Sequence, residues 1–92
     1  MQLAELIALA KIRSGKSQQS MAEEMGHNGK SRISKIGKGE LTADASEIVY
    51  LANSAHMNPI LVLAEIESER HPQLAGVWKK TIENMKAGIT SL

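Results

Sequence analysis

The chain has 92 residues, a formal net charge of +1 and no cysteine. This length suits one small domain near the lower limit at which a single core folds unaided, and without cysteine there is no disulfide framework and no thiolate metal site. The three histidines lack ligand spacing, no leader peptide is evident, and no run approaches the roughly 20 apolar residues of a membrane span, so we expect a cytoplasmic protein with no metal, cofactor or membrane partner.

Apolar residues recur with helical spacing along the chain and nothing alternates with period two, so we predict an all-α protein. The first helix covers residues 3–14 and ends where Gly15 lets the chain turn away. Ser17 is a good N-cap for a short second helix that ends at Gly26, because its hydroxyl can accept a hydrogen bond from a free amide of the first turn. The buried faces of these two helices are predicted to hold Leu3, Leu6, Ile7, Ala10, Met21, Ala22 and Met25.

A third helix, around residues 30–38, has the most distinctive predicted surface. Ile33 and Ile36 are its only large apolar residues and must face the core. At about 100° per residue, the rest of its surface is polar or cationic, with Ser31, Ser34, Lys35 and Lys38 outward and Lys30 and Arg32 on the flanks. Such side chains can contact phosphates and base edges, so we predict DNA contact here. We also expect Arg32 and Lys35 to be exposed and removable without loss of folding.

Two further helices and a C-terminal segment complete the predicted fold. Thr42 or Asp44 caps a fourth helix, and Asn58-Pro59 opens a fifth that runs to about Glu69. The fourth helix is predicted to bury Ala45, Ile48, Leu51, Ala52 and Ala55. After His71-Pro72, an amphipathic segment follows with one apolar stripe, formed by Leu74, Val77, Trp78, Ile82, Met85 and Ile89. Residues 1–70 thus form a five-helix DNA-binding domain, and residues 71–92 a C-terminal helix and tail.

Two packing arrangements are expected for the C-terminal segment. It can pack on the fifth helix, or it can form the seam of a homodimer, and both can hold at once. A dimer would bury more apolar surface than the small core of one chain does. The fifth helix is apolar nearly all round its first turns, and the surface helix of a small monomer does not need so many apolar residues. The residues predicted to form the seam are Ile60, Leu63, Leu74, Trp78 and Ile82.

Charge is distributed unevenly along the chain. Residues 1–38 carry seven Lys or Arg against three Glu, a net charge of +4, whereas residues 39–92 carry four against seven acids, a net charge of −3. Four of the seven cations lie in the predicted third helix and at its ends: Lys30, Arg32, Lys35 and Lys38. This polarity favours a nucleic-acid partner more than the small overall charge does.

The pattern Gly15-x-Ser17-Gln18-x-x-Met21-Ala22-x-x-Met25-Gly26, followed by Ile33-Ser34-Lys35-Ile36-x-Lys38-Gly39, resembles the helix-turn-helix domain of the phage repressor and Cro type. That family reads G-x-[ST]-Q-x-x-[LM]-A-x-x-[LM]-G, a turn, then I-S-[RK]-[IW]-E-x-G, and the resemblance covers about residues 3–66. The turn is one residue longer than usual. Gly37 replaces the usual Glu, which is expected to weaken the helix end by ~1 kcal/mol.

The resemblance implies a transcriptional regulator of phage or prophage type, such as a filamentous phage repressor. It would bind double-stranded DNA as a homodimer, with the third helix in the major groove and two half-sites about 34 Å apart. Gln18 is implied to brace against a phosphate and the recognition helix. Base contacts are implied for Lys30, Ser31 and Ser34, and backbone contacts for Lys35 and Lys38.

Other classes of function are less favoured by the sequence. Gly15-Lys16-Ser17 is similar to the end of a phosphate-binding loop, but Ala10 stands where that motif needs its first Gly and no strand precedes it, so we do not expect an enzyme. RNA binding is disfavoured because the chain has no Phe, one Trp and one Tyr for base stacking. The main alternative is a protein-interaction module on the same scaffold, such as an antitoxin or a phage-encoded inhibitor of a host protein, favoured by the low net charge and the apolar C-terminal half.

Overall fold

The computed structural model describes the backbone of residues 1–91 and the side chains of residues 1–84. Residues 1–91 contain helices and no strand, which confirms the predicted all-α fold. The elements are α1 (Leu3–Ser14), α2 (Gln18–Glu24), α3 (Ser31–Gly37), α4 (Ala45–Ser54), α5 (Pro59–Arg70), the short 3-10 helix η1 (Pro72–Leu74) and α6 (Ala75–Ser91). Met85 and Ile89, which were placed on the C-terminal stripe, lie outside the described side chains.

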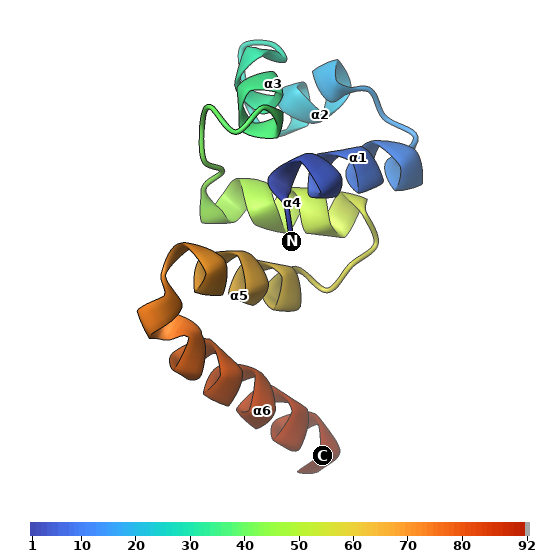
Figure 1. Ribbon diagram of the computed structural model, residues 1–92. Helices are drawn as coiled ribbons and strands as arrows, with labels where there is room; N and C mark the ends of the chain where they lie inside the picture. Colours follow the sequence, from blue (N-terminus) through green and yellow to red (C-terminus); the bar gives the residue numbers. More distant parts are fainter. Residues whose placement is uncertain (92) are drawn as a thin grey trace.

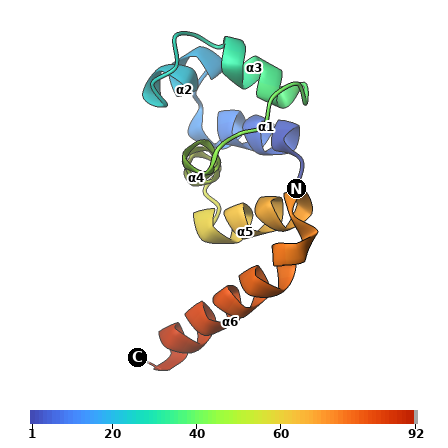
Figure 2. The same cartoon turned by 90° about the vertical axis from the view of Figure 1, so that its left-hand side faces the viewer.

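The helices are stacked along the longest dimension of a molecule that measures 42 × 29 × 20 Å. The first three lie together at one end, α4 lies between α1 and α5, and α6 leaves α5 after η1 (Figure 1). The view turned by 90° shows α6 extending away from the other helices as an arm (Figure 2). None of the helices within residues 1–91 is both long enough and apolar enough to cross a bilayer.

Local capping signals account for most of the helix boundaries. Gly15 follows α1 with a φ of 72°, a left-handed conformation that glycine adopts without strain. The Ser17 hydroxyl accepts a hydrogen bond from the Ser20 amide at 3.0 Å, as an N-cap does. Asp44, one of the two predicted caps, begins α4 as half of a capping box with Glu47. The predicted N-termini of α2 and α4 are therefore confirmed.

The core lies where α1, α2, α3, α4 and α5 meet. Its largest fully buried side chains are Leu6, Met21, Ile33, Ile36, Ile48 and Leu51. The burial of Ile33 and Ile36 confirms the predicted register of α3, because these two residues fix which of its faces is exposed. Met25 is only half-buried and packs at the edge of the core, so its predicted inward position is correct only in part.

Candidate nucleic-acid interface

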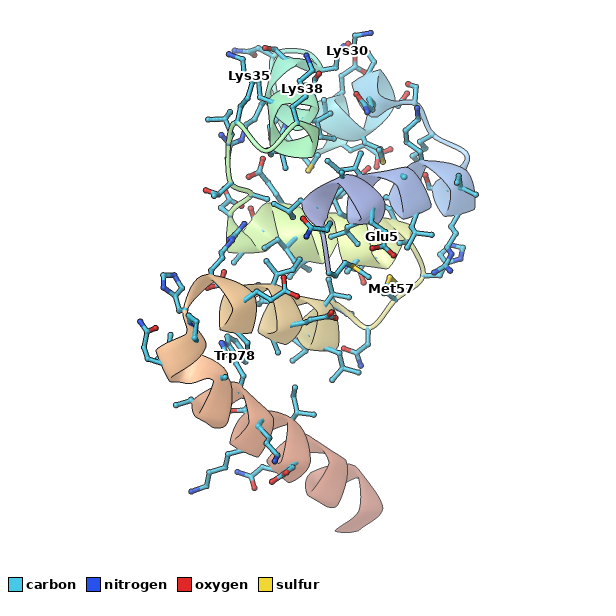
Figure 3. All side chains as sticks on the ribbon, viewed as in Figure 1. Glu5, Lys30, Lys35, Lys38, Met57 and Trp78 are labelled. Atoms are coloured by element: carbon cyan, nitrogen blue, oxygen red, sulfur yellow. The ribbon has the colours of Figure 1, made fainter. Side chains whose placement is uncertain are left out.

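The exposed face of α3 lies at the end of the molecule farthest from α6. Lys30, Lys35 and Lys38 project from this end, away from the other helices (Figure 3). Lys30 is the residue immediately before α3, so it lies at the N-cap and not on the helix itself. α2 packs against α3 from behind, and the turn between them contains Gly29 with a φ of 125°, a conformation open mainly to glycine. The sequence-predicted cations of this face are thus brought together.

Two hollows flank α3, one on each side. Ser34 of α3 and Lys38, the residue directly after the helix, line the first hollow together with Gln18 of α2. Ser31 and Lys35, four residues apart on the helix, line the second together with the α2–α3 turn. The exposed side of α3 therefore forms a ridge between the two hollows. Its two sides, or slopes, carry the polar side chains of Ser34 and Lys38 and of Ser31 and Lys35. A ridge of this kind can enter the major groove, which is about 12 Å wide and admits one α-helix.

Three of the seven cations of residues 1–38 are paired with other groups of the protein. Arg13 donates a hydrogen bond to the Ala55 carbonyl at 2.8 Å, at the C-terminal end of α4. Lys16 forms a salt bridge with Glu24 at 2.6 Å. Arg32 is also paired, as described below. Within residues 1–38, the four remaining cations have neither a salt bridge nor a side-chain hydrogen bond to a described residue: Lys11, Lys30, Lys35 and Lys38.

Arg32 forms a two-pronged ion pair that the sequence did not predict. Its Nε and Nη2 donate to the two carboxylate oxygens of Glu47, each at 2.7 Å. The Glu47 side chain is only 4% exposed and also accepts from the Asp44 amide at 2.9 Å, while His27 Nε2 lies 2.9 Å from its Oε2. Arg32 is therefore half-buried and paired, not simply exposed as expected, and we now expect its removal to destabilise the fold, because a buried carboxylate would lose its main partner.

Glu47 thus ties three parts of the domain together: the α2–α3 turn, α3 and the start of α4. The hydrogen bonds from Arg32 lower the pKa of Glu47 below its ordinary value, and the Asp44 amide acts in the same direction. Burial opposes this shift, since it disfavours the charged form. The carboxylate holds α3 in position and leaves its other face free.

Three residues of this region were not among the predicted site residues: Lys11, His27 and Glu47. Glu47 could have been found from the spacing Asp44-x-x-Glu47, which is the sequence signature of a capping box. Lys11 lines the first hollow from α1, and its exposure follows from the register set by Leu6, Ile7 and Ala10. No sequence pattern marks His27 as a residue of this site, because its contact with Glu47 depends on how the longer turn folds.

The C-terminal surface lies at the opposite end of the molecule. Of the predicted seam residues, Trp78 and Ile82 are half-buried where α6 faces α5, and Leu74 is 41% exposed (Figure 3). Ile60 is half-buried, whereas Leu63 packs against the main core and is less free than expected. Val77 of the predicted stripe is 62% exposed, and Leu61, an apolar residue of α5 on the same surface, is 40% exposed. The stripe therefore packs on α5 only in part.

No family model, curated protein or solved structure matches the chain. What the α1–α3 end can bind is therefore judged from its own residues. It presents four lysines with no salt bridge or side-chain hydrogen bond to a described residue, a ridge that carries serine hydroxyls, and two flanking hollows. These groups are hydrogen-bond donors and positive charges, which suit a ligand rich in acceptors and negative charge.

Proposed function

We propose that the protein is a sequence-specific DNA-binding transcriptional regulator of the phage repressor and Cro type, which uses α3 as its recognition helix. The observation that carries the proposal is the grouping of unpaired lysines along the α3 ridge, while the core-facing Ile33 and Ile36 are fully buried behind it. Lysines on such a ridge reach backbone phosphates on both sides of a groove. Ser31 and Ser34, between them, lie where base edges would be read.

Gln18 supports the same proposal from α2. It lines the hollow beside Ser34 and Lys38, as a residue that braces a recognition helix against a phosphate would. Lys35 belongs to the opposite slope of the ridge, where it reaches the other strand of the duplex. Arg32 acts indirectly in this scheme, because its ion pair with Glu47 fixes the orientation of α3. It is a positioning residue and not a direct contact.

A homodimer is part of the proposal. Helix-turn-helix proteins contact two half-sites about 34 Å apart, and a two-fold axis sets this spacing. The apolar side chains at the α5–α6 end are available to form the seam, since Leu61, Leu74 and Val77 are exposed there. This end lies away from α3, so a seam formed by it leaves both recognition helices free for DNA.

The test is selection of bound sequences from a pool of random duplexes by the purified native protein. Enrichment of an inverted repeat is expected, with half-site centres separated by about one helical turn. Lys35→Ala is the matched variant, because its side chain is exposed and unpaired among the described residues, and it should enrich the repeat weakly or not at all. Failure of the native protein to enrich any duplex would overturn the proposal in favour of a protein-interaction module.

A further inference from the structure

The hollow between α1 and α3 brings two cations together from distant parts of the chain. Lys11 of α1 and Lys38, directly after α3, both line it, and each is exposed. The described residues that line this hollow include no Asp or Glu, and neither lysine has a salt bridge with a described side chain. Like charges held near one another without a counterion repel, so an anion bound between them lowers the energy.

We propose that this hollow binds a phosphodiester group of the DNA backbone and that Lys11 supplies one of its two cations. The inference rests on the proposed function, because the ligand is a phosphate of the duplex whose groove α3 enters. Gln18 and Ser34 line the same hollow and add neutral donors to the two ammonium groups. A phosphodiester has one negative charge and two free oxygens, which accept from both kinds of donor.

The remaining lining of the hollow is apolar. Ile7 and the exposed Ile12 belong to it, while Ala4, Ala8 and Gly37 contribute small side chains or none and so leave room for a phosphate group. A Cβ added at Gly37 would come no closer than 3.6 Å to its nearest neighbour, Ile7 Cδ1, which is an ordinary van der Waals contact, so the methyl group of an alanine can be introduced there without a clash.

The site is tested by titrating a mixed-sequence duplex of about 20 base pairs with protein, over about 0.05–0.2 M KCl. Lys11→Gln should weaken binding several-fold and lower the slope of log K against log salt by about 0.9, the loss of one phosphate contact. Lys16→Gln is the matched control, because it removes the same charge from a lysine already paired with Glu24, and its slope should equal that of the native protein.

A second pair of variants separates charge from shape. Lys11→Arg, which keeps the positive charge, should bind the duplex with the salt dependence of the native protein, and Gly37→Ala should also bind as the native protein does. Equal affinity and slope for Lys11→Gln and Lys16→Gln, with the native protein still binding the duplex, would overturn this site and leave the proposed function standing. Absence of duplex binding by the native protein itself would overturn both. Thermal unfolding of each variant shows whether the fold is kept.

Discussion

Replacement of Glu47 by Gln tests whether the buried carboxylate holds the helix-turn-helix region together. Gln has nearly the same shape and can still accept from the Asp44 amide. Its amide nitrogen, however, would then face the Arg32 Nε donor, which now donates to the other carboxylate oxygen, the one that lies 2.9 Å from His27 Nε2. The substitution therefore removes a charge-assisted pair and leaves at least one buried donor without an acceptor.

We expect Glu47→Gln to lower the free energy of unfolding by about 2 kcal/mol, because a hydrogen bond to a charged group contributes about 1.5–3 kcal/mol. The lower half of that range applies, since Arg32 is 39% exposed and water can replace part of its interaction. For a domain of this size the corresponding fall in Tm is roughly 8–16 °C. Arg32→Ala should destabilise the native protein too, but should have little further effect in the Glu47→Gln background.

The assay is urea unfolding followed by circular dichroism, at about pH 7 and about pH 3. The pKa of Glu47 is lowered by Arg32 from the ordinary value of 4.5, so its contribution is present above pH 4.5 and is lost as the pH falls through the lower folded value. The difference between native and Glu47→Gln proteins should therefore shrink at the lower pH. A free energy of unfolding for Glu47→Gln within about 0.5 kcal/mol of the native value at pH 7 would refute the reasoning.

Three further predictions concern single side chains. Lys35→Ala should weaken duplex binding in a fluorescence anisotropy titration and leave urea unfolding unchanged, and loss of stability would contradict its exposed position. Gly37→Ala should raise the free energy of unfolding by about 0.5–1 kcal/mol, because Gly37 is helical and an added methyl group meets no close neighbour; a decrease would show hidden strain. Trp78→Ala should weaken self-association measured by sedimentation equilibrium, and an unchanged dimer would place the seam elsewhere.

Much of the fold could be predicted because the signals that define it are local. Ser17 and Asp44 mark helix starts by the chemistry of their own side chains, and Gly15 marks a helix end by its backbone freedom. The inward face of α3 followed from having just two large apolar residues, Ile33 and Ile36. Each of these features depends on residues within one or two turns, where periodicity and capping rules apply.

The candidate site was harder to predict, because it depends on contacts between segments distant in sequence. In the sequence, Arg32 cannot be distinguished from an unpaired cation, because its partner Glu47 is 15 residues away and belongs to α4. Nothing in the sequence relates Lys11 to α3, whereas the packing of α1 places it in the same hollow as Lys38. A count of basic residues records how many charges a segment has, but pairing decides which of them a ligand can use.

The position of Trp78 has a practical consequence for spectroscopy. The chain has one Trp and one Tyr, and Trp78 lies half-buried between α5 and α6, at the opposite end of the molecule from α3 (Figure 3). Indole emission therefore reports on the solvent exposure of the arm, while Tyr50, which donates a hydrogen bond to Glu24 at 2.6 Å, belongs to the helical domain. Selective excitation of the indole can follow changes in the solvent exposure of the arm in the native sequence, without a label and without disturbing the lysines at the other end.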